Sequence, residues 1–371
     1  MAQGILMLWL FIIPVLVYAS LLLYIAGYLK KITPEPSAST GNYLSLSVVT
    51  ACRNEEKNIT GLLDALASQE YPRHLFEVII VDDNSSDATF SLAKEFRDLG
   101  NLKVIRSTGR GKKAAQGTGI INASFPLIVT TDADCRMGPL WLSSIAGFFL
   151  KHHPGMIIGP VNLPVNDRFT DTFQQIEWAA LQGITAGTAA AGNPVLCNGA
   201  NLAFTGDAYM KHSGNLKNKL ASGDDIFLLQ SLKTEKNVKI MWLQSTEATV
   251  TTPAAGSLKA LLNQRARWVS KSGGYRDPFT ILLAIVTFAA NLSLPVLFSL
   301  AFLRDDCTFL LPAIAFTVKV SADLYFLIHS FIILRISKPR KFPVRLFFSE
   351  ILYPLYILIV ALKSIGRSGR W

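Results

Sequence analysis

The chain reads Pro126-Leu127-Ile128-Val129-Thr130-Thr131-Asp132-Ala133-Asp134, an apolar run that ends in two carboxylates one residue apart. A short apolar run bounded by polar residues is typical of a buried strand, and ligand-binding loops in α/β sheets follow such strands. Carboxylate oxygens suit Mg2+ or Mn2+, so the pair can face a divalent cation and a diphosphate together. The run therefore predicts a catalytic site at the end of a strand. A turn-capping role for Asp132 and Asp134 is the alternative.

Strand and helix patterns alternate around this run. Apolar or β-branched strands are expected at 46–50, 78–81, 104–105 and 127–129, with helices near 55–68, 88–99 and 112–123 between them. This βαβα order predicts a mostly parallel α/β sheet covered on both faces. Further strands are expected at 156–158, 202–204 and 240–242, around a long helix from Arg168 to about Ala190.

The composition indicates membrane segments in addition to this domain. Of 371 residues 50% are hydrophobic, and the mean hydropathy of +0.33 is too high for an ordinary soluble domain. Residues 5–29 carry no charge and are followed by Lys30-Lys31, so they are expected to span a bilayer. A cleaved signal peptide is the weaker alternative, because the run is long, lacks a basic amino end and is not closed by a small-x-small pattern.

Three more apolar segments follow the domain, at 279–303, 308–334 and 346–362. Within the second of them Lys319 and Asp323 are one helical turn apart, so they are expected to pair and point into the protein, as a structural contact rather than a transport relay. The third holds Glu350 and Pro354 and is short, which leaves an interfacial or re-entrant helix open.

Basic residues predict the orientation in the membrane. Lys30-Lys31 and the basic segments 265–276 and 335–341 belong on the cytoplasmic side, which makes the central domain cytosolic and the outer loop 304–307 external. The protein is expected to be integral to a bacterial inner membrane. One conflict arises, because three full carboxy-terminal spans would place Lys363, Arg367 and Arg370 outside.

The net charge of +10 follows from this topology, since cytoplasmic basic residues attract anionic membrane lipids, and no nucleic-acid partner is expected. The cysteines have no Cys-x-x-Cys spacing; they are Cys52, Cys135, Cys197 and Cys307. Neither a disulfide framework nor a zinc site is expected.

Five segments in order carry a resemblance to a known family. They are Thr50-Ala51-Cys52-Arg53-Asn54-Glu55-Glu56, Val81-Asp82-Asp83-Asn84-Ser85-Ser86-Asp87, Asp132-Ala133-Asp134, Asp224-Asp225 and Gln264-Arg265-Ala266-Arg267-Trp268. The chain resembles the processive-type family 2 glycosyltransferases over roughly 45–270. These include cellulose, chitin, hyaluronan and poly-N-acetylglucosamine synthases, and ceramide glucosyltransferase is similar.

The resemblance implies a GT-A fold, a Rossmann-like nucleotide-diphospho-sugar transferase domain flanked by transmembrane helices. On this reading a transmembrane helix at 1–31 and a linker at 32–44 precede a cytosolic domain at 45–270, and interfacial and transmembrane helices fill 271–371. The implied partners are a nucleotide-sugar donor, membrane lipids and a lipid or glycan acceptor; the implied cofactor is Mg2+ or Mn2+. The oligomeric state is left open.

The resemblance also implies a donor site. Its expected donor-binding residues are Thr50, Glu55, Asp83, Lys112, Asp132, Gln264, Arg267 and Trp268. Asp134 would ligate the metal, with Asp132 beside it. For Glu55 a stabilising place at a helix amino terminus is the alternative. For Lys113, the second lysine of the Lys112-Lys113 pair, the alternative is a solvated charge run.

The remaining implied roles concern catalysis and the acceptor. Asp225 matches the general base, with Asp224 where the family more often has glutamate; a helix cap is the alternative. Asn201, Trp178 and again Trp268 are the expected acceptor-binding residues, although Trp178 suits a core position equally. For the 264–268 segment the alternative is an amphipathic interfacial helix with arginines facing lipid headgroups, which suits Arg265 better than Arg267.

The sequence thus predicts an inverting, metal-dependent glycosyltransferase that moves a sugar, UDP-linked by resemblance, to a membrane-associated lipid or glycan. A processive polysaccharide synthase is one alternative, and a membrane protein with an inactive nucleotide-sugar-binding domain is another. A soluble-type nucleotidyltransferase or phosphatase would not need the 264–268 segment beside a span. A transporter would not need the α/β domain.

Overall fold

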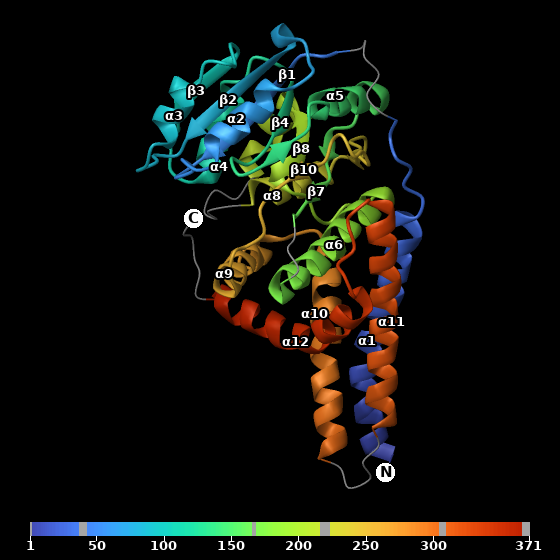
Figure 1. Cartoon of the computed structure of the whole chain (residues 1–371). Helices are drawn as coiled ribbons and strands as arrows, with labels where there is room; N and C mark the ends of the chain where they lie inside the picture. The colour runs from blue at the N-terminus through green and yellow to red at the C-terminus, as the bar shows by residue number, and fades with distance from the viewer. Residues whose placement is uncertain (1, 37–42, 165–167, 216–222, 304–308, 366–371) are drawn as a thin grey trace. The chain divides into compact units, whose positions relative to one another are not determined.

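The chain folds into two units that alternate along the sequence (Figure 1). The computed structural model describes residues 2–36, 43–164, 168–215, 223–303 and 309–365. A helical unit comprises the described residues within 1–31, 165–191 and 255–367, and an α/β unit comprises those within 32–164 and 192–254. The middle of the expected linker, the loop 304–307, Cys307, Arg367 and Arg370 lie outside the described residues.

Four parallel strands form the half of the main sheet that carries the acidic run. They are β1 (Leu46–Cys52), β2 (Phe76–Asp82), β3 (Leu102–Arg106) and β4 (Leu127–Thr130), in the order β3-β2-β1-β4. Leu46 of β1 pairs with Phe76 of β2 and with Leu127 of β4, so the carboxyl ends of these strands share one edge. Every residue of β1 is buried, and because successive residues face opposite sides, both faces are covered there. The predicted parallel core is present.

The other half of the sheet is mixed. β8 (Leu202–Thr205) runs antiparallel to β4 and to β6 (Met156–Ile158), and β9 (Ile240–Trp242) runs parallel to β6. A second sheet joins β5 (Arg136–Met137), β10 (Val250–Thr251) and β7 (Val161–Asn162). This second sheet was not predicted, because strands of two residues are too short to show a periodic pattern.

Helices of the α/β unit fill the connections between strands. They are α2 (Ile59–Ala67), α3 (Thr89–Glu95), α4 (Lys112–Ile121), α5 (Trp141–His152), α7 (Gly206–His212) and α8 (Asp224–Leu232). A β-carbon on Gly119 would lie 2.4 Å from Cγ1 of Val49 and 2.9 Å from Cγ2 of Val81, so glycine allows α4 to lie directly on β1 and β2. The amino end of α4, with Lys112, is thereby held beside the strand ends. Helices α5 and α7 were not predicted.

The helical unit contains the long apolar helices. They are α1 (Ala2–Leu29), α10 (Pro278–Phe302), α11 (Leu310–Ile333) and α12 (Phe342–Ile365), and all four are long and apolar enough to cross a membrane. Within this unit α1, α10 and α11 run side by side, whereas α12 runs across them (Figure 1). Ile12 and Val15 of α1 pack with Leu294 and Leu297 of α10 in a buried cluster.

Two further helices, α6 (Phe169–Ala190) and α9 (Leu258–Val269), also belong to the helical unit, although both fall inside the expected domain 45–270. Two glycines on α6 explain its place. A β-carbon added to Gly187 would lie 2.6 Å from Ile25 of α1, and one added to Gly183 would lie 2.2 Å from Ser330 of α11. Such a close approach between helices requires glycine. The sequence pattern of α6 alone does not show which helices it packs against.

The predicted pair Lys319 and Asp323 is present on α11, with the ammonium nitrogen 2.9 Å from Oδ2. Lys319 is 2% exposed and also contacts Glu350 of α12, while the Tyr18 hydroxyl of α1 donates to Oδ1 of Asp323 over 2.5 Å. This network ties three helices together, in keeping with a structural role.

Candidate functional site

The two aspartates of the acidic run directly follow β4. The backbone N–H of Cys135 donates to the carbonyl of Asp132 over 3.1 Å and closes the turn, so neither side chain is needed to close it. Ala133 is buried, while Asp132 and Asp134 are partly exposed. Neither carboxylate is therefore committed to closing the turn, and both are accessible to a ligand.

Negative charge is concentrated around this turn. Burial, followed by the charge of Asp132, raises the pKa of the Asp134 carboxyl. Burial also raises the pKa of Glu55, and the charges of Asp134 and Asp132 add to the increase. A hydrogen bond from Asn58 acts in the opposite direction and lowers that pKa, but it does not cancel the increase. The structure thus brings three of the predicted site carboxylates within electrostatic reach of one another.

Lys112 supplies the positive charge at the centre of this group. Its ammonium nitrogen contacts Oδ1 of Asp132. Burial lowers the pKa of Lys112, but the charges of Asp132, Asp224 and Asp225 outweigh burial and raise that pKa above its ordinary value. Lys112 therefore links the acidic turn after β4 to the two aspartates that begin α8.

The residues present fit a divalent cation that is shared with a diphosphate. Among the described residues no group of three or more His, Cys, Asp or Glu side chains is arranged to hold a metal ion. Mg2+ commonly binds one or two carboxylates and takes its other ligands from substrate phosphates and water. Asp134 and Asp132 would supply such a pair, and a cation there would offset the repulsion from Asp132 that adds to the effect of burial on the pKa of Asp134.

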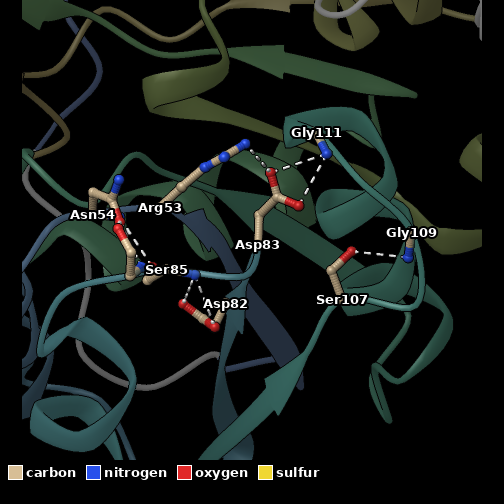
Figure 2. Close-up of polar contacts among 9 residues, drawn as sticks. Arg53, Asn54, Asp82, Asp83, Ser85, Ser107, Gly109 and Gly111 are labelled. Atoms are coloured by element: carbon tan, nitrogen blue, oxygen red, sulfur yellow. Dashed lines mark hydrogen bonds and ion pairs between the residues drawn. The ribbon is translucent and has the colours of Figure 1, made fainter.

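Asp83 holds the loop that precedes α4. Figure 2 shows its two carboxylate oxygens accepting the backbone N–H of Gly111, each over 2.9 Å, with Arg53 3.7 Å away. Gly111 has φ of 93°, a conformation that favours glycine, and it immediately precedes Lys112. The resemblance implied a contact between Asp83 and the base of the donor; here the carboxylate also fixes the backbone that positions Lys112. Sequence reasoning did not select Arg53 for any role.

Thr50 and Glu55, near the carboxyl end of β1, differ in burial and in hydrogen bonding. The Thr50 side chain is fully buried, and its hydroxyl has no hydrogen-bond partner among the residues that the structure describes. The Glu55 carboxylate accepts a hydrogen bond from Asn58 over 2.7 Å. Since α2 begins only at Ile59, Glu55 is not in the first turn of a helix, and that alternative reading of Glu55 was wrong.

Asp225 lies at the start of α8 and is bonded to two backbone groups. One oxygen accepts the N–H of Ile226 over 2.8 Å, and the other accepts the N–H of Gly199 over 3.3 Å. The carbonyl of Gly199 in turn accepts the hydroxyl of Thr130, the last residue of β4, over 2.9 Å. Asp225 is thereby tied to the same strand end as the acidic turn. Asp224 is more deeply buried, at 8% exposure.

Asn201 and Trp178, the expected acceptor-binding residues, are both buried. The Asn201 amide donates to the carbonyls of Pro160 and Ala248 over 2.8 and 2.7 Å, and its oxygen accepts from the Trp141 indole over 3.0 Å. These bonds join the two sheets and leave the amide little capacity for an acceptor. Trp178 is 6% exposed and lies on α6 of the helical unit.

Gln264, Arg267 and Trp268 lie on α9 of the helical unit. The Trp268 ring is half-buried, with its centroid 6.1 Å from that of Trp178. The alternative reading in which Arg265 faces lipid headgroups was wrong, because Arg265 is 5% exposed and is paired with Glu177 of α6. The role of this segment in donor binding stays a prediction.

Lys112→Met is expected to raise the affinity of the donor-free protein for Mn2+ about tenfold, because the ammonium group and the metal compete for the same carboxylates. Manganese titration followed by electron paramagnetic resonance measures this affinity. Lys113→Met, which removes the same charge one residue further on, is the matched control. An equal increase in both variants, or none in Lys112→Met, would contradict a direct competition.

A comparison with family models identifies residues 47–206 as a match to Glycosyl transferase family 2. The match includes the acidic turn, Glu55, Asp83 and Lys112, and it ends before Asp224 and α9. The predicted family resemblance is confirmed over this segment.

Two characterised relatives match parts of the same region. The chain is 31% identical over 117 residues to the poly(ribitol-phosphate) β-N-acetylglucosaminyltransferase TarS of Staphylococcus aureus, covering 31% of this chain and 20% of TarS. It is 34% identical over 124 residues to the β-monoglucosyldiacylglycerol synthase of Trichormus variabilis, covering 32% of this chain and 26% of the synthase. The chain therefore aligns with only about a quarter or less of the length of these relatives.

Among solved structures, the mannosyltransferase PcManGT from Pyrobaculum calidifontis, in complex with GDP-Man and Mn2+, resembles the whole chain. The TM-score is 0.58 with 17% sequence identity, and the alignment covers 96% of this chain and 99% of the mannosyltransferase. At this identity the likeness concerns the fold. It confirms the expected α/β GT-A fold combined with long apolar helices.

Proposed function

We propose that this chain, whose residues 47–206 form a glycosyl transferase family 2 domain, transfers a sugar from a nucleotide-diphosphate sugar to a membrane-associated lipid or glycan acceptor. The observation that carries the proposal is the convergence of Lys112 with Asp132, Asp224 and Asp225 at the strand ends of the α/β unit. Carboxylates from two separate elements around one partly buried ammonium group can bind a diphosphate through a cation and still leave a base for an acceptor.

Each residue then has a chemical task. Asp225 takes the proton from the acceptor hydroxyl as that oxygen attacks the anomeric carbon. Lys112 binds the diphosphate that leaves with the bonding electrons, and Asp132 holds the donor sugar or ribose. A divalent cation held by Asp134 would neutralise the charge that develops on the leaving nucleotide diphosphate. A single displacement by the acceptor oxygen would invert the anomeric configuration.

The nucleotide is proposed to be UDP, by resemblance to the family. The solved structure of the mannosyltransferase of similar fold is in complex with GDP-Man, so GDP-sugars are the necessary comparison. The proposed acceptor is membrane-associated, since four helices of the chain are long and apolar enough to cross a membrane. A lipid acceptor has support from one relative that is named a glucosyldiacylglycerol synthase.

We further propose an inner-membrane protein with a cytosolic α/β unit, in which α12 lies along the membrane surface. Support comes from the crosswise direction of α12 within the helical unit (Figure 1) and from its exposed side, which carries Phe347, Phe348, Ile351 and Leu352. A helix in this position would keep Lys363 on the cytoplasmic side. The conflict with the positive-inside rule would then disappear.

The test of the proposed function is a direct assay of the purified protein in detergent. UDP-linked and GDP-linked sugars are supplied separately with Mn2+ or Mg2+ and a membrane lipid extract, and nucleoside diphosphate release and product mass are measured. Metal-dependent release together with a glycosylated lipid or glycan is the expected result. Tight binding of a nucleotide sugar without any release would point instead to an inactive binding domain, and a ladder of product masses would indicate a polymer synthase.

Trp268→Ala is expected to reduce transfer to a membrane-associated acceptor about tenfold, and to reduce slow hydrolysis of the donor by water much less. The reason is that an indole gives a sugar ring a flat apolar face, and aromatic contacts of this kind contribute up to about 1.5 kcal/mol. The measurement is the ratio of transfer to hydrolysis, with Trp268→Phe as the control that keeps an aromatic face. An equal loss in both reactions would show that the tryptophan serves the donor or the fold.

A further inference from the structure

A buried ionic network joins α6, α9 and α12 within the helical unit. Oε2 of Glu177 on α6 accepts the Nε–H of Arg265 on α9 over 2.9 Å and lies 2.8 Å from its Nη2. Oε1 of the same carboxylate accepts the hydroxyl of Tyr356 on α12 over 2.9 Å. The side chains of Arg265 and Glu177 are only 6% and 9% exposed. Both oxygens of Glu177 are thus occupied, one by each neighbouring helix.

Arg265 connects this network to the predicted functional segment of α9. Its guanidinium donates through Nη1 to the side-chain oxygen of Gln264, and its Cζ lies 4.2 Å from the centroid of the Trp268 ring. One guanidinium therefore contacts two of the three residues that the family resemblance singles out. Arg267 differs, because its guanidinium has no hydrogen-bond or ion-pair partner among the described residues and is only half-buried.

A second polar attachment joins α6 to the segment that carries α9, in addition to the packing of Phe173 with Leu261 and of Trp178 with Trp268. There the side chain of Gln174 donates to the carbonyl of Ala255 over 3.1 Å and accepts its N–H over 2.9 Å, just before α9 begins. Gln174 and Glu177 are three residues apart on α6 and so lie on the same side of that helix. If the contact at Arg265 were lost, the entry to α9 would stay anchored while the helix itself could rotate.

The energetic weight of the pair follows from its burial. Burial lowers the pKa of Arg265, but the charge of Glu177 outweighs burial and raises it, so the guanidinium stays charged. Removing one partner of a buried pair leaves the other charge unpaired, which is far more disruptive than removing both. Arg265 would then have to turn toward water, and Gln264 and Trp268 would lose the group that both of them contact.

We propose that Glu177 is a positioning residue, which through Arg265 fixes the rotation of α9 and thereby orients the Gln264 amide and the Trp268 ring for sugar transfer. The catalytic part of this inference rests on the proposed function. The structural part, that Glu177 holds α9 in place, does not.

Glu177→Gln tests the structural part without any substrate. The amide keeps the shape and an oxygen for Tyr356 but removes the charge that pairs with Arg265. Hydrogen exchange of α9 amides, followed by mass spectrometry of the full chain in detergent, is expected to be at least about tenfold faster than in the original protein. Glu350→Gln is the matched control, since it neutralises a buried carboxylate that contacts Lys319 of α11 instead of α9. Unchanged exchange in α9, or the same increase in Glu350→Gln, would overturn the proposal.

The double variant Glu177→Gln with Arg265→Met separates positioning from stability. Without a buried unpaired charge, its thermal unfolding midpoint is expected to return toward that of the original protein. The ratio of acceptor transfer to donor hydrolysis is expected to stay about tenfold low, as in Glu177→Gln, because no guanidinium orients Gln264 and Trp268. If both the unfolding midpoint and the ratio of transfer to hydrolysis recovered, Glu177 would contribute to stability alone and the positioning role would be overturned. If the original protein transfers no sugar, the proposed function fails, while the exchange of α9 still decides whether Glu177 holds the helix.

Discussion

Asp134→Ala is expected to abolish metal-dependent turnover, lowering the rate by at least roughly 100-fold, as the loss of a comparable electrostatic stabiliser does. Asp134 lies at the carboxyl end of β4, and its pKa is raised by burial and then by the charge of Asp132. A carboxylate whose negative charge is disfavoured by its surroundings gains from binding a cation. Removal of Asp134 takes away the predicted metal ligand and leaves only Asp132, which Lys112 already contacts.

The measurement combines rate with metal binding. Nucleoside diphosphate release and the Mn2+ titration should both fail in Asp134→Ala, while the far-ultraviolet circular dichroism spectrum and extraction from the membrane stay unchanged. Asp207→Ala is the matched control, because it removes an exposed aspartate from the first turn of α7, away from the acidic turn. Near original activity in Asp134→Ala would exclude Asp134 as the metal ligand.

Asp225→Asn is expected to reduce sugar transfer by on the order of 100- to 10,000-fold, the usual contribution of a general base. The amide keeps the shape of the side chain, and its oxygen can still accept the N–H of Gly199 or of Ile226, so the local structure should persist. What it loses is basicity. Donor binding should therefore stay within a few-fold of the original value.

Rate and binding are measured separately, the first by product formation and the second by calorimetric titration with UDP. Asp224→Asn is the companion variant, because Asp224 also raises the pKa of Lys112 and is the next candidate for the base. If donor affinity fell in parallel with the rate in Asp225→Asn, Asp225 would be a donor-site residue. A collapse of transfer in Asp224→Asn alone would assign the base to Asp224.

The strands of the α/β core were predictable because their signal is local. Runs of consecutive apolar residues such as those in β1, β2 and β4 are long enough to mark buried strands, and the order of strands and helices implies parallel pairing. Once parallel pairing is assumed, the residues after each strand must share one edge. This is why Asp83 and the pair Asp132 and Asp134 could be placed at one edge of the sheet from the sequence pattern, whereas Glu55 was added by the family resemblance.

Other features of the fold, such as the direction of a strand or the unit to which a helix belongs, could not be predicted, because their causes lie far away in the sequence. The antiparallel direction of β8 in the sheet depends on its pairing with β4, which lies more than 70 residues earlier in the chain; Leu202, for example, pairs with Thr130. The two-residue strands of the second sheet have no period to detect. The helix α6 has the pattern of an ordinary helix, and its place in the helical unit depends on distant contacts, such as those of Gly183 with α11 and of Gly187 with α1.

The sequence by itself revealed the resemblance to the family 2 glycosyltransferases, the acidic turn after an apolar strand and the apolar helices, since each depends on residue types at short spacing. Only the tertiary structure decided how individual charges are paired. Lys112 meets Asp132, Asp83 binds Gly111, and Arg265 rather than Arg267 is buried against Glu177. The physical reason is that a charged side chain takes its role from the partner and the degree of burial that the fold gives it. Two arginines one residue apart on α9 share a residue type, but they face different surroundings.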